Sequence, residues 1–484
     1  MLYLGIDLGT SSVKAVLADE EKIIASASRK YKLLIPQEGW TEQNPEDWWQ
    51  GAKECIKELA EKFDLKNELA AVSFCGQMHG LVLLDKEDKV IRPAILWNDQ
   101  RTTKECEYLN DVIGKKKLIE LTGNIAFTGF TAPKVLWVRK NEPQNFSRIA
   151  KVMLPKDYVS YMLSGVFASD VSDDSGTLYF DVKNRRFSDE VCEILSLNKE
   201  WLPKVYESYE AVGTVKKEVA KELCISEKAL VVIGGGDQAV GAIGTGTVEN
   251  NAVSISLGTS GVVFAASDKF VESREGTMHS FRHANGKFHS MGCMLSCAGA
   301  LDHFVNVLEK SGNFEELTEE AEKRSVSDVV FLPYFSGERS PINDPYAKAA
   351  FFGMSLSTER GDLTRAVLEG ASFGLYDCLK SLNEMGIYPK SARVIGGGTK
   401  SRLWMSILAD VLGIRLSTIN TADGGALGAI ILAMTASGKY KTVEEGCKAL
   451  IKDVEYFEPN AEMHAAYDKK FDRFKKLYEA TKGI

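Results

Sequence analysis

The sequence predicts an α/β fold made of two related domains. The chain has 484 residues, which is more than one ordinary hydrophobic core accommodates. A β-rich run, a Gly-Thr-Ser turn and a second β-rich run form a hairpin pattern at residues 4–17, and the pattern recurs at residues 253–264, about half a chain later. Because a repeated supersecondary unit indicates a repeated domain, we expect one domain at 1–245 and another at 246–484.

Strands and helices alternate around the two hairpins. Strands are predicted at three runs that each end at glycines, namely residues 69–74, 229–233 and 392–395. Sheets of α/β proteins bind ligands at the carboxyl ends of such strands. Helices are predicted to begin at Pro45, with Asn44 as the N-cap, and to cover residues 362–383 and 462–480.

Composition and charge argue against several classes of protein. The net charge is −8, so we expect no nucleic-acid surface and no binding to anionic membranes. No basic leader precedes a long apolar stretch, and no apolar run reaches the length of about 18 residues that a membrane span needs. The nine cysteines form no zinc pattern, which favours free thiols in a reducing cytoplasm.

The first hairpin has the composition of a phosphate-binding turn. Asp7 stands on the strand just before Gly9, Thr10 and Ser11, whose backbone N–H groups and hydroxyls suit phosphate oxygens. A carboxylate beside a phosphate requires a cation between them, and Mg²⁺ is held in this way by one or two carboxylates. Asp7 is therefore the candidate metal ligand, and the three turn residues are candidate ATP ligands. An ordinary tight hairpin is the alternative.

The second hairpin extends this interpretation to a nucleotide. It keeps the turn at Gly258 and Thr259 but has Ser256 where the first hairpin has Asp7. Two turns that face phosphate, together with a single carboxylate for a metal, are what the binding of one nucleotide with its Mg²⁺ ion requires. The sequence contains neither a Walker A loop nor a dinucleotide-binding fingerprint, which excludes the two commonest glycine-rich nucleotide motifs.

Two longer stretches resemble the signatures of a known family. Residues 129–137 and 349–369 are similar to the two signatures of the FGGY carbohydrate kinases, and the similarity covers nearly the whole chain. The resemblance implies two actin-like, ribonuclease H-like domains with an active-site cleft between them. It also implies ATP as the phosphoryl donor, with Mg²⁺ as its cation.

The same resemblance suggests roles for individual residues. It assigns proton transfer to Asp237, which follows a strand and three glycines, although a helix N-cap is the alternative. It assigns Met78 and His79 to sugar contact, although packing in a glycine-rich turn is the alternative. Gln238, next to Asp237, is a further candidate sugar ligand. Asp7 is also a candidate catalytic residue, because it would hold the metal ion. The backbone is expected to approach the nucleotide, at its adenosine end, around Gly397, Gly398 and Ser401.

Within the family, the sequence is most similar to members that phosphorylate D-xylulose. The stretches that resemble them are residues 76–80, 95–99, 154–158 and 333–339. The implied product is D-xylulose 5-phosphate, which feeds xylose catabolism and the pentose phosphate pathway. The alternatives are another ketose or polyol, such as ribulose or glycerol, and a nucleotide-gated binding protein of the actin kind. A homodimer is left open.

Overall fold

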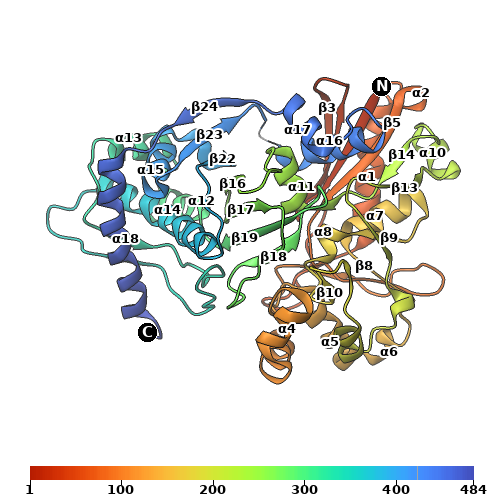
Figure 1. Cartoon of the computed structure of the whole chain (residues 1–484), viewed down its shortest axis with the longest axis horizontal. Helices are drawn as coiled ribbons and strands as arrows, with labels where there is room; N and C mark the ends of the chain where they lie inside the picture. Colours follow the sequence, from red (N-terminus) through yellow and green to blue (C-terminus); the bar gives the residue numbers. More distant parts are fainter. Residues whose placement is uncertain (422) are drawn as a thin grey trace.

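The computed structural model describes residues 1–421 and 423–484, which contain two seven-stranded sheets (Figure 1). The strands of the N-terminal sheet follow the order β13 (Ala211–Thr214), β14 (Leu230–Val232), β5 (Leu69–Gly76), β1 (Leu2–Leu8), β2 (Ser12–Ala18) and β3 (Ile23–Lys30), with β15 (Gly235–Gly236) beside β5. The strands of the C-terminal sheet follow the order β18 (His279–Arg282), β19 (Phe288–Met294), β17 (Gly261–Ser267), β16 (Val253–Leu257), β22 (Ser391–Ile395), β23 (Arg415–Ile419) and β24 (Asp453–Phe457).

The two sheets repeat the same core arrangement. Strand β1 is antiparallel to β2 and parallel to β5, and strand β16 is antiparallel to β17 and parallel to β22. Asp7 lies opposite Lys14 in the first hairpin, and Ser256 lies opposite Val262 in the second. The predicted hairpins and the three predicted strands that end at glycines are therefore confirmed.

The long helices lie where the sequence predicts them. Helix α1 (Pro45–Ala60) has Asn44 at its N-cap, although the Asn44 side chain makes no capping hydrogen bond. The predicted helices at 362–383 and 462–480 correspond to α14 (Arg360–Glu384) and α18 (Ala461–Thr481). Among the described residues, none of the helices combines the length and apolar character that crossing a membrane requires.

Shorter elements cover the sheets and build the lower lobe in Figure 1, where α4, α5 and α6 lie. The remaining α-helices are α2 (Leu65–Glu68), α3 (Thr103–Glu107), α4 (Lys115–Thr122), α5 (Thr131–Asn141), α6 (Pro143–Phe146), α7 (Pro155–Ser164), α8 (Val171–Asp174), α9 (Asp189–Leu195), α10 (Lys217–Leu223), α11 (Asp237–Gly244), α12 (Ala298–His303), α13 (Phe314–Glu322), α15 (Arg402–Leu412), α16 (Gly424–Ala436) and α17 (Val443–Leu450). Two-stranded sheets pair β4 (Glu42–Gln43) with β7 (Ala94–Ile95), β6 (Val82–Leu84) with β8 (Lys151–Met153), β9 (Ala168–Asp170) with β12 (Lys204–Tyr206), β10 (Phe180–Asp181) with β11 (Arg186–Phe187), and β20 (Val330–Leu332) with β21 (Ala350–Phe352).

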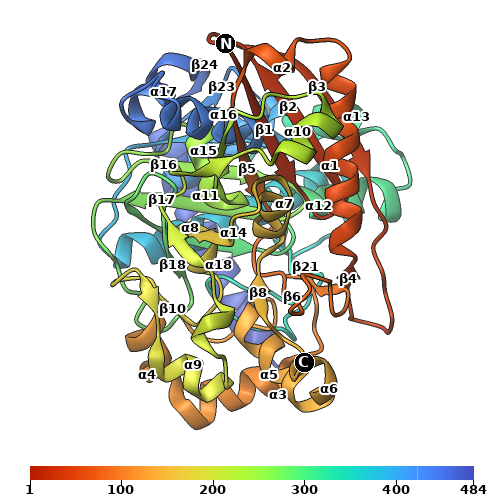
Figure 2. The same cartoon turned by 90° about the vertical axis from the view of Figure 1, so that its right-hand side faces the viewer.

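Helices α11 and α16 join the two halves of the chain. They lie against each other between the sheets, as both views show (Figures 1 and 2). Their backbones touch, because a Cβ atom added at Gly244 would lie 1.8 Å from the Gly424 carbonyl oxygen, and one added at Gly428 would lie 1.9 Å from the Val240 carbonyl oxygen. Helix α16 also packs on β1, where a Cβ at Gly5 would lie 2.8 Å from the Ala426 carbonyl oxygen. A helix of the C-terminal half thus completes the N-terminal core.

Candidate active site

A cavity of about 280 Å³ lies between the two halves of the chain. Strands β1, β16 and β22 and the first turns of α11 and α16 contribute to its walls. The lining side chains and backbone include Asp7, Gly9, Asp237, Gln238, Ser256, Ile395 and Gly425. Residues 230 positions apart are therefore brought to one site, since the two predicted catalytic carboxylates, Asp7 and Asp237, face the same cavity.

Three side chains that do not line the cavity donate hydrogen bonds to oxygen atoms of the turn after β1 and hold it in place. The Tyr31 hydroxyl donates to the Gly9 carbonyl, the Gln43 amide donates to the Thr10 carbonyl at 2.6 Å, and Trp97 Nε1 donates to Thr10 Oγ1 at 2.9 Å. In the described part of the chain, the N–H groups of Thr10 and Ser11 have no protein acceptor. The turn therefore offers donors to an anion, as a phosphate site requires.

Asp7 is surrounded by negative charge. Burial raises the pKa of its carboxyl to about 7, and repulsion from Asp423 and Asp237 adds to the increase. Lys14, opposite Asp7 in the hairpin, forms an ion pair with Asp423 instead. Among the described residues, no group of three or more His, Cys, Asp or Glu side chains is arranged to hold a metal by itself. A carboxylate in this position suits Mg²⁺, which takes most of its ligands from phosphate and water.

Asp237 is the first residue of α11, and the N-cap is Gly236. The alternative role of Asp237 as the N-cap is therefore wrong. Burial raises the pKa of the Asp237 carboxyl to about 6, against the lowering effect of hydrogen bonds from Gln238. The side chain lines the cavity, where an ionised carboxylate can accept a proton from a bound molecule.

Two of the glycines before Asp237 allow close packing against β5 and against Met78, which lies two residues beyond that strand. Gly234 has a positive φ of 69°, and a Cβ there would lie 1.9 Å from the Phe74 carbonyl oxygen. A Cβ at Gly236 would lie 2.8 Å from Met78 Cγ. The predicted sugar residue Met78 is thus a direct neighbour of the backbone that precedes Asp237.

His79 is held in one orientation by its surroundings. Its Nδ1 lies 2.8 Å from the Gly176 carbonyl oxygen, and its ring stacks on Phe130 with centroids 4.7 Å apart. The carbonyl can only accept, so Nδ1 carries the proton. Burial lowers the pKa of His79 well below its usual value, which leaves the ring neutral and Nε2 as an acceptor. Neither His79 nor Met78 lines the 280 Å³ cavity itself.

The second turn and the glycines after β22 lie side by side. The carbonyls of Gly258 and Thr259 accept the N–H groups of Ala298 and Cys297 at the start of α12, both at 2.8 Å. A Cβ at Gly398 would lie 2.7 Å from Leu257 Cβ, directly before this turn, whereas one at Gly397 would meet nothing within 4 Å. The structure therefore brings four of the predicted ATP residues together.

Ser401 differs from the other predicted ATP residues. Its hydroxyl is the N-cap of α15 and accepts the Trp404 N–H at 3.3 Å. Its side-chain oxygen is thus already used by the protein, and any contact with a nucleotide would come from the hydroxyl proton or the backbone. Its expected ligand role stays a prediction.

Helix α16 also contributes to the site, which the sequence did not predict. Asp423 caps this helix by accepting the Ala426 N–H at 3.2 Å, and a Cβ at Gly425 would lie 3.1 Å from Asp7 Oδ2. The available signal is Asp423 followed by Gly424 and Gly425, which begin α16 after β23. Glycines and an aspartate also meet at the start of α11, although there the glycines come before Asp237.

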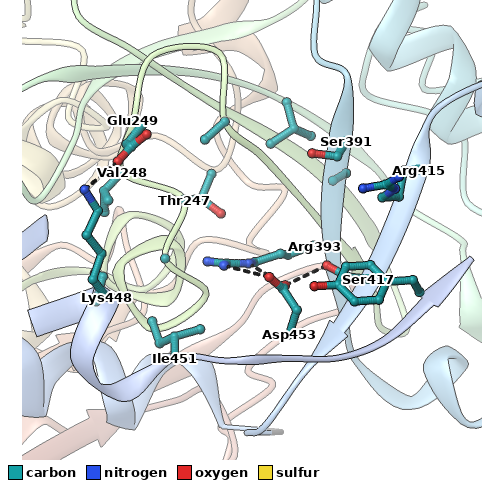
Figure 3. A pocket seen from close by; sticks show the side chains of 16 residues that line it. Thr247, Val248, Glu249, Ser391, Arg393, Arg415, Ser417, Lys448, Ile451 and Asp453 are labelled. Carbon is teal, nitrogen blue, oxygen red and sulfur yellow. Dashed lines mark hydrogen bonds and ion pairs between the residues drawn. The ribbon is translucent and has the colours of Figure 1, made fainter.

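A second cavity, of about 430 Å³, lies at the linker between the halves (Figure 3). Two pairs of its charged side chains are satisfied within the protein: Arg393 pairs with Asp453 at 2.9 Å and Lys448 with Glu249 at 3.1 Å. Arg393 also donates to the Thr245 carbonyl at 2.8 Å, just after α11. These pairs support the packing of the linker, and the 280 Å³ cavity with Asp7 and Asp237 remains the candidate active site.

Comparison with known proteins defines the family. Residues 2–244 match the N-terminal domain of the FGGY family of carbohydrate kinases, and residues 253–437 match its C-terminal domain. The chain belongs to the FGGY family of carbohydrate kinases. An FGGY kinase from Escherichia coli (strain K12), named xylulose kinase, is 41% identical over 99% of both chains.

Solved structures of FGGY kinases have the same fold. A xyloylose kinase from Brucella ovis is 37% identical, with a TM-score of 0.94 and 99% of each chain covered. A gluconate kinase from Lactobacillus acidophilus is 25% identical, with a TM-score of 0.95 over 99% of this chain and 98% of that one. These superpositions confirm the predicted two-domain actin-like fold. Since proteins named for different sugars superpose equally well, the fold by itself does not identify the sugar.

Proposed function

We propose that this FGGY kinase transfers the γ-phosphoryl group of ATP to D-xylulose and forms D-xylulose 5-phosphate and ADP. The observation that most strongly supports this proposal is that Asp237 and Asp7 line one cavity between the halves, with Met78 packed behind Asp237. The 41% identity to a protein named xylulose kinase supports the choice of sugar. The product would enter xylose catabolism and the pentose phosphate pathway.

ATP would be bound by backbone donors from both halves. Gly9, Thr10 and Ser11 would hold phosphate oxygens from one side and Gly258 and Thr259 from the other, while Gly397, Gly398 and Ser401 would lie at the adenosine end. Asp7 would hold Mg²⁺, which neutralises phosphate charge when it is bound. The raised pKa of Asp7 fits this role, because a cation would relieve its repulsion with Asp423 and Asp237.

Asp237 would accept the proton of the 5-hydroxyl as its oxygen forms a bond to the γ-phosphorus and the bond to the ADP oxygen breaks. With a pKa of about 6, Asp237 is mostly ionised at neutral pH and can act as the base. His79 Nε2 would accept a hydrogen bond from a sugar hydroxyl, since its Nδ1 is occupied by Gly176. Gln238 would be a further sugar ligand, and Met78 would form the apolar wall.

We also propose the division of the chain at residue 245, with a sugar-binding domain at 1–245 and an ATP-binding domain at 246–484. The continuous sheets of the two halves support it, although α16 packs on the N-terminal sheet. A cytoplasmic location is supported by nine free cysteines. The proposed partners are ATP and the sugar, without nucleic acid or membrane, and a homodimer is left open.

A panel of acceptors tests the sugar assignment. ADP release is measured with a coupled assay in the presence of D-xylulose, ribulose, glycerol or gluconate at matched concentrations. We expect the highest kcat/KM with D-xylulose. A higher value with another acceptor would replace D-xylulose but keep the kinase, whereas no stimulation by any acceptor would support a nucleotide-gated binding protein of the actin kind.

A further inference from the structure

We propose that Ser172 is a positioning residue for Asp237 and acts through the backbone amide of Gly236. Buried Asp170 and Lys156 hold Ser172 in the required orientation. The inference rests on the proposed role of Asp237 as the base, and it adds a residue from outside the cavity lining to the machinery of the reaction.

Ser172 contacts the backbone directly before the base. Its Oγ accepts the N–H of Gly236 at 3.1 Å, although the two residues are 64 positions apart in the sequence. Ser172 also leaves no room for a side chain at the neighbouring position, because a Cβ at Gly235 would lie 2.4 Å from Ser172 Oγ. This serine is fully buried, so water does not compete for the bond. The start of α11 is thus tied to α8.

Asp170 fixes the direction of the Ser172 hydroxyl. Asp170 Oδ2 accepts the Ser172 hydroxyl proton at 2.5 Å and the Ser172 backbone N–H at 2.8 Å. With its proton committed to Asp170, the hydroxyl presents a lone pair to Gly236. The other Asp170 oxygen lies 2.9 Å from the buried ammonium of Lys156, which also pairs with Asp157 at 2.5 Å.

The same buried group lies beneath the segment that bears the candidate sugar residues. A Cβ at Gly76 would lie 2.7 Å from Lys156 Cβ, and Gly76 is followed at once by Gln77, Met78 and His79. Gly236 pairs with Gly76 through the contact between β15 and β5. One network of Lys156, Asp170 and Ser172 therefore supports both the base and the sugar-binding segment, and it fixes their relative position.

The test compares Ser172→Ala with Ser208→Ala. The Ser208 hydroxyl also donates to Asp170 Oδ2, at 2.7 Å, and it is equally buried, but it does not contact Gly236. Both variants lose one bond to the same carboxylate, but Ser172→Ala also leaves the buried Gly236 N–H without its acceptor, so we expect Ser172→Ala to lose more thermal stability than Ser208→Ala. We expect Ser172→Ala to lower kcat about 10- to 100-fold with little change in sugar KM, because small misplacements of a reacting group have effects of this size. Ser208→Ala should lower kcat by about threefold at most.

Hydrogen exchange gives a second measurement that does not depend on the sugar. In Ser172→Ala, amide exchange should become faster in a peptide covering residues 230–240, and in Ser208→Ala it should stay as in the parent protein. Equal kcat in Ser172→Ala and the parent protein, or equal losses in the two variants, would overturn the proposal. If the parent protein phosphorylates no sugar, the proposed function fails, whereas unchanged exchange in Ser172→Ala refutes the positioning contact alone.

Discussion

At the scale of single residues, two carboxylates in one cavity are suited to different tasks. Asp7 lies near Asp423 and Asp237, and their repulsion helps to raise its pKa to about 7, so a bound cation would be favoured there. The pKa of Asp237 is raised to about 6 by burial alone. We therefore propose that Asp7 holds the metal and that Asp237 accepts the proton.

Replacing Asp237 tests its role as the base. Asp237→Asn keeps the size of the side chain but removes its ability to accept a proton. We expect kcat to fall by about 10²- to 10⁴-fold, which is the usual contribution of a general base, with a much smaller change in sugar KM. Steady-state kinetics at saturating ATP measure this, and near-normal turnover would remove Asp237 from the mechanism.

The pKa of Asp237 also predicts the pH dependence of turnover. Only the ionised carboxylate can accept a proton, and a pKa of about 6 means that this form is lost as the pH falls through 6. We expect kcat/KM for the sugar, measured at saturating ATP and Mg²⁺, to be level above neutral pH and to decrease about tenfold per pH unit below pH 6. A kcat/KM that stays constant down to pH 5 would contradict the proposed role of Asp237; circular dichroism at each pH checks that the protein remains folded.

At the scale of secondary-structure elements, the contact of α11 and α16 joins the halves and positions Asp237 and Gly425 at their first turns. Close backbone contact between the two helices requires glycine. A Cβ at Gly428 would lie 1.9 Å from the Val240 carbonyl oxygen, whereas a Cβ at Gly241, on α11, would meet nothing within 4 Å.

Alanine at Gly428 and alanine at Gly241 should have different effects on the free energy of unfolding. We expect Gly428→Ala to lower it by about 1–3 kcal/mol through overpacking. We expect Gly241→Ala to leave it unchanged or to raise it by about 0.5–1 kcal/mol, because alanine favours a helix over glycine. Urea unfolding measures both, and equal destabilisation by the two substitutions would argue against a close helix contact.

Local elements could be predicted from the sequence, but contacts between distant elements could not. The hairpins and α14 could be predicted because each is encoded by a short pattern of apolar and turn residues that are neighbours in the sequence. The pair of Lys14 and Asp423 joins residues 409 positions apart. The bond from Gly236 to Ser172 leaves no trace in either local sequence, because a buried serine in a short helix has no pattern of its own. For Asp237, the family resemblance pointed to catalysis where local chemistry favoured a cap.

At the scale of the whole molecule, the two halves have the same core topology (Figure 1), and the candidate active site is the cavity that residues of both halves line. The N-terminal half contributes both carboxylates and the candidate sugar residues, and the C-terminal half contributes the second turn and the glycines after β22. Sugar and nucleotide would therefore meet only where the halves meet. Bringing them together there would exclude water and limit wasteful hydrolysis of ATP.

The most direct test of this account measures ADP and sugar phosphate in the same samples. The purified protein is incubated with ATP, Mg²⁺ and D-xylulose, and the products are quantified by ³¹P NMR. The account predicts equal amounts of ADP and D-xylulose 5-phosphate, with ADP at background level when the sugar is omitted. ADP release at the same rate with and without sugar, and no sugar phosphate, would contradict it.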